Sequence, residues 1–227
     1  MLSNYVIATI KDWHLNEYNR RKETDFKNWR LINHPDKLTM ELLTKLNPKY
    51  IFFPHWSWIV PGEIVNAFTC VCFHSSDVPY GRGGSPIQNL IIRGHTETKI
   101  SALKMVGEVD AGPVYMKAPL SLHGNAQEIF ENSAKVIADM MIEISKNNPE
   151  PIPQIGEATV FKRRKNTDNT IATDKDLTYV YNQIRMLDAE SYPKAFIDHG
   201  NLHLEFTDSK LEGEELMATV RITQKAC

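Results

Sequence analysis

Two titratable side chains with complementary chemistry stand in segments that are punctuated by glycine and proline. His74 lies in FHSSDVPYGRGGSPIQNLI, residues 73–91, and Asp110 lies in EVDAGP, residues 108–113. A carboxylate next to an imidazole holds the ring in one tautomer and raises its basicity, so the pair can take up a proton and pass it on. These residue types predict general acid–base chemistry, provided that the fold brings the two loops together.

The residues that follow His74 indicate a tight loop close to a ligand. Gly81, Gly83 and Gly84 allow positive φ angles and a close approach of the backbone. Arg82 places a fork of hydrogen-bond donors among them. A lone histidine is more often structural, but a loop constrained in this way favours a functional role for His74.

Hydrophobic periodicity predicts the elements that position these loops. Short apolar runs predict buried strands over residues 5–10, 50–54 and 68–73. Helical spacing predicts helices over residues 39–46, 61–65, 85–93 and 126–146, and weak alternation predicts a hairpin of strands over 98–105 and 112–120. The polar, basic segment 15–33 is expected to form a loop and a short helix. Strands that alternate with helices favour an α/β domain with a mainly parallel sheet. Ligands bind beyond the carboxyl ends of such strands, and His74 directly follows the run 68–73.

A proline-rich segment, PEPIPQ at 149–154, marks a predicted domain boundary. It separates a domain of residues 1–150 from a small α+β subdomain of residues 151–227. In this subdomain the pattern predicts a helix and several short strands, over residues 160–164, 174–187, 195–197, 202–206 and 216–222. The subdomain is expected to contact substrate and is a candidate for forming a homodimer.

Bulk properties narrow the class of protein. The chain has 227 residues, a formal net charge of -2 and three cysteines, at positions 70, 72 and 227. The charge predicts no nucleic-acid partner. The cysteines show neither disulfide nor zinc spacing, and the remaining histidines show no ligand spacing, so no metal is expected. Free thiols and a short N-terminal apolar run predict a soluble cytoplasmic protein without a membrane segment.

The motif HSSDVPYGRGGSPIQ resembles the H-x-S-x-L-P-x-x-R-G-x-x-P pattern of the 10-formyltetrahydrofolate-dependent formyltransferases, which include methionyl-tRNA formyltransferase and the sugar-nucleotide N-formyltransferases. VDAGP matches the D-x-G-P element of that family. The resemblance implies a Rossmann-like formyltransferase domain and N10-formyltetrahydrofolate as co-substrate. It also implies that His74 polarises the formyl group and relays the amine proton, while Asp110 orients the imidazole.

The resemblance also implies binding residues. WSWIVPGEIV, residues 56–65, is similar to the segment that lines the folate pocket. The implied folate-binding residues are Trp56, Ser57, Trp58, Ile59, Gly107 and Val109. The implied substrate-binding residues are Tyr80, Arg82, Gly83, Gly84, Arg163, Arg164, Asn182 and Arg185. Structural alternatives stay open: the two indoles can belong to the core, the pair at 163–164 can be a solvated edge, and Arg185 can be a packing residue.

One position departs from the family. The pattern reads N-x-H, with the asparagine donating to the formyl oxygen, whereas this chain has Cys72 there. Cysteine is a weak donor. A donor from elsewhere replaces the asparagine, or His74 carries more of the oxyanion stabilisation, or the enzyme is slow. Cys72 is also a candidate nucleophile, although its place beside Cys70 fits a small buried side chain better.

The segments 161–171 and 181–196 look like the sugar-nucleotide branch of the family. The resemblance therefore implies transfer of a formyl group to a UDP- or dTDP-linked 4-amino-4,6-dideoxy sugar in surface-glycan biosynthesis. Similarity to the pseudaminic-acid-type enzymes makes UDP-4-amino-4,6-dideoxy-N-acetyl-altrosamine the candidate acceptor. The alternatives are methionyl-tRNA formyltransferase, which the short C-terminal part and the acidic balance disfavour, a formyltetrahydrofolate hydrolase, and a folate-binding protein without catalysis.

Overall fold

The computed structural model describes residues 5–190 and 192–225. Cys227, the third cysteine of the sequence, lies outside the described residues. The chain divides into two compact units. Unit 1 comprises residues 1–82, 99–120 and 131–160, and unit 2 comprises residues 83–98, 121–130 and 161–227.

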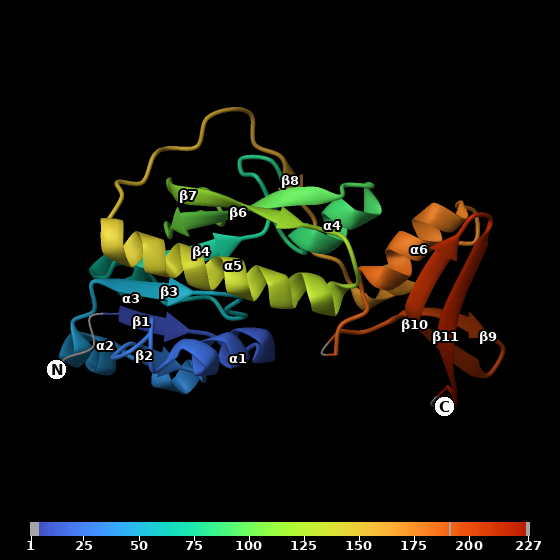
Figure 1. Cartoon of the computed structure of the whole chain (residues 1–227), viewed down its shortest axis with the longest axis horizontal. Coiled ribbons are helices and arrows are strands. Elements are labelled where there is room, and N and C mark those ends of the chain that lie inside the picture. Colours follow the sequence, from blue (N-terminus) through green and yellow to red (C-terminus); the bar gives the residue numbers. More distant parts are fainter. Residues whose placement is uncertain (1–4, 191, 226–227) are drawn as a thin grey trace. The chain divides into compact units, whose positions relative to one another are not determined.

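A six-stranded sheet with the order β2-β1-β3-β4-β6-β7 organises unit 1 (Figure 1). Its strands are β1 (Tyr5–Ala8), β2 (Arg30–Ile32), β3 (Tyr50–Phe53), β4 (Cys70–His74), β6 (Glu97–Lys104) and β7 (Val114–Ser121). β1 pairs in parallel with β2 and β3, and β3 pairs in parallel with β4. β6 then runs antiparallel to β4. The expected Rossmann-like α/β domain with a mainly parallel sheet is confirmed.

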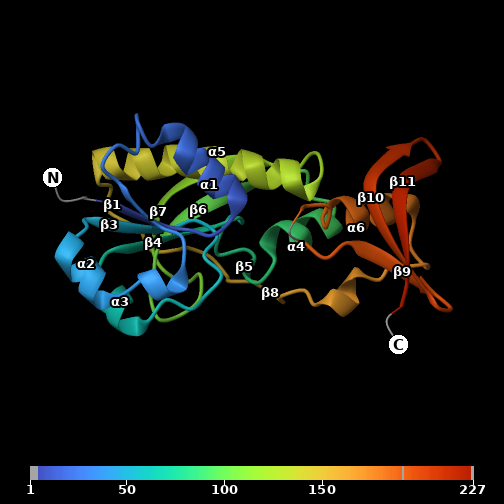
Figure 2. The ribbon, with the colours of Figure 1, turned by 90° about the horizontal axis from the view of Figure 1, so that it is seen from below.

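Helices cover both faces of this sheet because its central strands are apolar on both sides. All four residues of β3 are buried. Figure 2 shows α1 (Asp12–Arg21) and α5 (Ala126–Asn147) on one face, and α2 (Met40–Leu46) and α3 (Gly62–Ala67) on the other. Leu43 of α2 and Ile64 of α3 join one core cluster with Ile51 and Phe53 of β3. The layers hold the carboxyl ends of β3 and β4 in fixed register, with Phe53 opposite Cys72.

Unit 2 holds a small helix pair and a three-stranded antiparallel sheet. Its elements are α4 (Pro86–Ile92), α6 (Leu177–Arg185), β9 (Ala195–His199), β10 (Leu202–Glu212) and β11 (Glu215–Gln224). The sheet order is β11-β10-β9, and α6 packs on β10 (Figure 1). Two further short strands, β5 (Arg82–Gly83) and β8 (Val160–Phe161), pair with each other. The small C-terminal domain expected from the sequence is therefore present.

The prediction for residues 15–33 differs most from the structure. The segment holds a helix and a turn, as expected, but the helix α1 has ten residues and begins at Asp12, and the turn leads into the unpredicted strand β2. Its buried face carries Trp13, His14 and Glu17 rather than aliphatic residues. Glu17 pairs with Arg21 (2.5 Å), which also reaches Asp139 of α5 (2.6 Å). A helix held by ion pairs has no apolar period for sequence analysis to detect.

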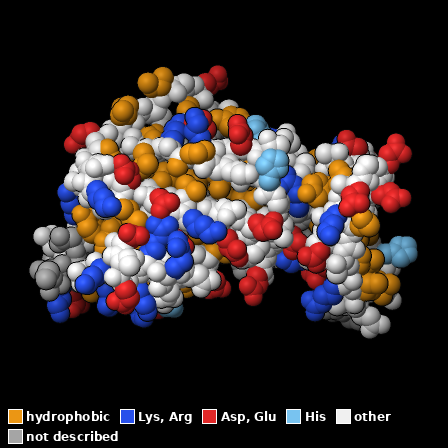
Figure 3. Space-filling model, in the orientation of Figure 1, with side chains coloured by type: hydrophobic (Ala, Val, Ile, Leu, Met, Phe, Trp, Pro, Cys, Tyr) orange, Lys and Arg blue, Asp and Glu red, His pale blue; other side chains and the backbone are white. Residues whose placement is uncertain are grey.

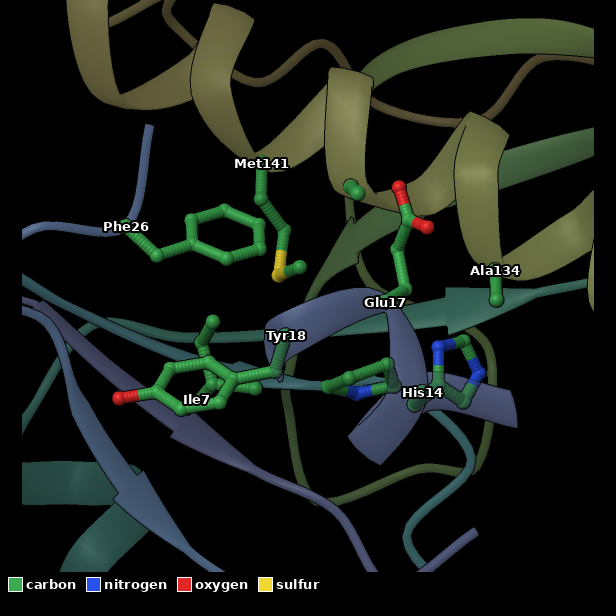
Figure 4. Close-up of a pocket in the computed structure, with 9 residues that line it drawn as sticks. Ile7, His14, Glu17, Tyr18, Phe26, Ala134 and Met141 are labelled. Atoms are coloured by element: carbon green, nitrogen blue, oxygen red, sulfur yellow. The ribbon is translucent and has the colours of Figure 1, made fainter. Parts of the chain in front are cut away.

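A small cavity lies between α1, α5 and β1 (Figure 4). Ile7, Tyr18, Phe26 and Met141 line it, and Figure 4 shows their side chains turned toward one another.

No helix within the described residues is long and apolar enough to cross a membrane. The division at residue 150 stays a prediction.

Candidate functional site

The candidate site lies at the carboxyl ends of β3 and β4. His74 is the last residue of β4, opposite Ser101 of β6, and its side chain is buried. Sequence analysis predicted it just past the strand, so its position is confirmed to within one residue. Asp110 stands in the loop between β6 and β7 with a φ of 53°, in the left-handed region that non-glycine residues seldom adopt.

The fold brings His74 and Asp110 together. Nδ1 of His74 lies 3.3 Å from Oδ2 of Asp110. Nε2 lies 2.7 Å from the carbonyl oxygen of Gly81. A carbonyl only accepts, so Nε2 carries a proton and donates. The contact at Nδ1 is attractive only when another proton lies between ring and carboxylate. The pair therefore has an exchangeable proton to take up or release, as general acid–base chemistry requires.

Arg82, a predicted substrate residue, points into a network within unit 1. Its Nε and Nη2 donate to Oε1 of Gln154 (3.0 and 2.8 Å), and Nη1 lies 3.4 Å from Glu108. Nε2 of Gln154 donates in turn to the carbonyl oxygens of Asp110 and Gly112, both at 2.8 Å. Sequence analysis missed Gln154, because a glutamine in a proline-rich linker carries no chemical signal. Tyr80, which precedes this network, is 37% exposed.

The predicted folate-binding residues lie on two loops of unit 1. The rings of Trp56 and Trp58 meet edge to face at 5.1 Å, so both indoles lie on one side of their loop, as alternation predicts. Trp56 packs against the core, and its buried Nε1 has no hydrogen-bond partner among the described residues. Trp58, Ile59 and Val109 are exposed. Ser57 and Gly107 are also exposed. Exposed apolar side chains beside an unsatisfied indole N–H fit a flat, heteroatom-rich ligand.

Cys72 is poorly suited to nucleophilic attack. Desolvation by burial, followed by the nearby charge of Asp110, raises the pKa of its thiol to about 12. At neutral pH the group is a thiol, whereas the thiolate is the reactive form. The geometry therefore favours the small-filler alternative for Cys72.

Replacing Cys72 with alanine is expected to lower formyl transfer by less than about tenfold, well below the 10²–10⁴-fold that an acid–base residue contributes. The physical reason is that a protonated thiol supplies neither a nucleophile nor a strong donor. Steady-state rates, with thermal unfolding as a control for folding, would check this. Loss of turnover in a folded variant, or rapid inactivation of the wild type by iodoacetamide, would contradict it.

Sequence analysis also missed a pair of histidines near His74, the buried His14 and the half-buried His55. The Trp13 indole N–H donates to Nδ1 of His55 (3.2 Å). That nitrogen must therefore accept, so Nε2 of His14 donates to it as well (2.8 Å). Burial is the main cause that lowers the pKa of His55 to about 4, with contributions from Lys11 and His74. Burial, then His55, holds the pKa of His14 well below its usual range. Both rings are neutral at pH 7.

This pair should make the protein sensitive to acid. The pKa of His55 is lower in the folded state than in the unfolded chain, so the unfolded state binds more protons. Stability is fully present above about pH 6.5 and is lost as the pH falls toward 4, by up to roughly 3 kcal/mol for His55. Urea unfolding at pH 7 and pH 5 would measure the loss. His55→Asn should lose less stability on acidification than wild type, while the exposed-site control His123→Asn should match wild type. Equal losses in all three proteins would contradict this account.

The other predicted substrate residues belong to unit 2 and are engaged within it. A Cβ on Gly84 would lie 2.4 Å from Cα of Arg163, so the two backbones nearly touch. The backbone N–H of Arg164 donates to Oγ of Ser85 (3.2 Å), its guanidinium contacts the carbonyl of Asp168, and burial lowers its pKa. Gly83 stands in β5.

Arg185 is buried and hydrogen-bonded within unit 2. Its Nη1 donates to the carbonyl oxygens of Leu122 (2.6 Å) and Gly124 (2.8 Å), and its Nε donates to Oδ1 of Asn182 (2.8 Å). Desolvation lowers its pKa. These contacts favour the packing alternative for Asn182 and Arg185. Within the part of the chain that the structure describes, no group of three or more metal-ligating side chains is found.

Comparisons with known proteins bear on these features. The model of the family described as formyl transferase matches residues 15–139, and that of the methionyl-tRNA formyltransferase C-terminal domain matches residues 166–223. A solved structure named methionyl-tRNA formyltransferase from Clostridium thermocellum is 47% identical to this chain and has a TM-score of 0.95. The match covers 99% of this chain and 100% of that structure's chain.

A curated methionyl-tRNA formyltransferase from Sulfurihydrogenibium sp. is 27% identical over 207 residues, which are 84% of this chain and 65% of the relative. One from Thermodesulfovibrio yellowstonii is 28% identical over 151 residues, or 63% of this chain and 49% of the relative. The chain thus spans about half to two thirds of the length of these curated relatives. A sugar N-formyltransferase from Shewanella sp. shares the fold with a TM-score of 0.66 at 13% identity.

These findings overturn the acceptor inferred from sequence. The assignment to the sugar-nucleotide branch is wrong, because the 47% identical structure and the C-terminal family model are both named for methionyl-tRNA formyltransferase. The expected role in pseudaminic-acid-type surface-glycan synthesis is wrong for the same reason. Neither the hydrolase nor the non-catalytic alternative gains support. The exclusion of nucleic acid is also wrong. Net charge sums over the whole chain and conceals local basic runs, such as KRRK at 162–165.

Proposed function

The chain belongs to the formyl transferase family, and we propose that it transfers a formyl group from N10-formyltetrahydrofolate to the amino group of the methionine in methionyl-tRNA. The observation that carries this proposal is the His74–Asp110 pair, held at 3.3 Å where β4 ends. It places a proton-relaying group at the edge of the sheet where α/β proteins bind their ligands.

The family takes its formyl group from N10-formyltetrahydrofolate. The residues present fit such a donor. Trp58, Ile59 and Val109 offer exposed apolar surface for a flat ring system. The buried Nε1 of Trp56 lacks an acceptor that a pterin or amide oxygen would supply.

The proposed reaction forms one carbon–nitrogen bond and breaks another. The methionine nitrogen attacks the formyl carbon, and the resulting tetrahedral intermediate collapses with cleavage of the bond to N10. The amine loses one proton and N10 gains one, so the step balances to formylmethionyl-tRNA and tetrahydrofolate. His74 takes the amine proton at Nδ1 when the pair with Asp110 has released its shared proton, since Nε2 already carries one, and it passes a proton to N10. Asp110 stabilises the charged imidazole and keeps it oriented.

Two observations support methionyl-tRNA as the acceptor. The C-terminal match at residues 166–223 and the full-length match at 47% identity both carry that name. In addition, Lys162, Arg163 and Lys165 of unit 2 are exposed and form a local basic run that suits RNA phosphates. Because this chain is shorter than the curated relatives, the acceptor needs a direct test.

The test incubates the purified protein with methionyl-tRNA and N10-formyltetrahydrofolate, then releases the amino acid by mild base for mass spectrometry. Formylmethionine is the expected product. Uncharged tRNA and N-acetylmethionyl-tRNA, which lacks a free amine, serve as controls and should give none. Recovery of unmodified methionine with intact donor would overturn the proposed acceptor. Donor consumed to free formate would overturn the transfer itself.

A further inference from the structure

We propose that Gln154 is a positioning residue that holds Asp110 against His74. This inference deepens the proposed formyl transfer and rests on it for the role of the pair. Gln154 belongs to the linker after α5, far from both catalytic loops in sequence. Its amide bridges Arg82 on one side and the backbone of the Asp110 loop on the other.

The geometry of the bridge is specific for an amide. Oε1 of Gln154 accepts two bonds from Arg82, at 3.0 and 2.8 Å. Nε2 donates to the carbonyl oxygens of Asp110 and Gly112, each at 2.8 Å. A carboxylate would lack the two donors and an amine would lack the acceptor, so neither side chain reproduces the bridge.

The strained backbone of the Asp110 loop needs hydrogen bonds that stabilise it. Asp110 adopts a φ of 53°, which costs of order 1 kcal/mol or more for a non-glycine residue. Its neighbours Glu108 and Val109 are exposed and contribute little packing. Two hydrogen bonds to carbonyls on either side of Ala111 fix the backbone that aims the Asp110 carboxylate at Nδ1 of His74.

Elsewhere the linker is held mainly through its backbone, by the pairing of Ile152 with Val114 (2.8 and 2.9 Å) and by the bonds of Thr159 to the segment that ends at Arg82. Among residues 152–160, all of which the structure describes, Gln154 is the one residue that is not exposed. Ile152 and Ile155 on either side are 65% and 85% exposed. Figure 3 shows apolar side chains gathered at the top of the view, where Figure 1 draws the linker. Gln154 is therefore the linker side chain that joins Arg82 to the Asp110 loop, and it does so through hydrogen bonds rather than apolar burial.

Gln154→Glu separates the two halves of this bridge. The carboxylate keeps an acceptor for Arg82, so the linker stays anchored, but it puts an oxygen against the carbonyls of Asp110 and Gly112. We expect kcat to fall by roughly 10- to 100-fold, as small displacements of catalytic groups do, with KM for both substrates changed less than about threefold and thermal stability preserved. Ile155→Ala, a change in the same linker, is the matched control and should retain the kcat of wild type.

A readout independent of turnover is the pH titration of His74, followed by NMR of its ring proton. If Gln154 positions Asp110, the curve in Gln154→Met, a side chain of similar volume without hydrogen bonds, moves toward that of Asp110→Asn. Methionine is used for this readout because the carboxylate of Gln154→Glu would itself act on the ring. A wild-type curve in a folded variant would overturn the inference. Absence of formylated product from wild type, with the titration shifted as predicted, would instead count against the proposed function alone.

Discussion

Replacing His74 with asparagine should lower the rate of formyl transfer by about 10²–10⁴-fold, the usual contribution of a positioned general acid–base group. Asparagine is close in size to the Nδ1 side of the ring, so its amide can still face Asp110. It cannot accept a proton from the attacking amine. The loss should therefore fall mainly on kcat, while KM for donor and acceptor stays near that of wild type.

Single-turnover rates with saturating donor and acceptor would measure this loss without interference from product release. Asp110→Asn should give a smaller loss than His74→Asn, because it leaves the imidazole in place but removes the charge that orients it. The double variant should be no slower than His74→Asn by more than a small factor, since both residues act as one unit. A His74→Asn enzyme within threefold of wild type would show that proton transfer does not use this ring.

Gly112→Ala should cause the second large effect, on stability and on the site together. A Cβ at this position would lie 1.7 Å from the carbonyl oxygen of Lys104, a backbone atom that cannot rotate away. Overpacking of this kind costs about 3 kcal/mol, which corresponds to a fall in Tm of roughly 6–12 °C for a protein of this size. The shift of the loop would also displace Asp110, two residues away.

The matched control is Gly62→Ala at the first residue of α3. A Cβ there meets nothing within 4 Å, and the φ of Gly62 is not positive. This variant should unfold within a few degrees of wild type and keep its activity. Differential scanning calorimetry of the two variants and wild type would compare their Tm values. If Gly112→Ala were as stable as Gly62→Ala, the close approach of the two hairpin backbones would not be a feature of the folded protein.

Sequence patterns predicted the central sheet well because its strands are apolar on both faces. The runs 50–54 and 68–73 correspond to β3 and β4, and the end of the second run located His74 to within one residue. The helix 126–146 was equally clear, since α5 spans Ala126–Asn147 with apolar positions at helical spacing. A hydrophobic pattern that repeats along a helix or strand can therefore be detected from the sequence alone.

Features that depend on long-range contacts were not accessible in this way. The start and length of α1 could not be predicted because its buried face is formed by Trp13, His14 and Glu17. His55 is neutral only because the fold surrounds it with Trp13 and His14. Gln154 gains its role only when the linker returns to the Asp110 loop. In each case the partner lies far away in sequence, so spacing carries no signal.

The acceptor was misjudged for a different reason. The motif around His74 is shared across the family, so it identifies the formyl chemistry without distinguishing one amine from another. Discrimination between acceptors resides in residues outside that motif. Net charge was a poor substitute, because three exposed basic residues at 162–165 coexist with an overall charge of -2.

The most direct test of the account is a single-turnover reaction of wild-type protein with N10-formyltetrahydrofolate carrying ¹³C in its formyl group and with methionyl-tRNA. We predict that the label appears on the methionine nitrogen at the rate at which the donor disappears, and that His74→Asn slows both by at least about 100-fold. Label found in free formate, or label transferred equally fast by His74→Asn, would contradict the claim that the His74–Asp110 pair catalyses formyl transfer to methionyl-tRNA.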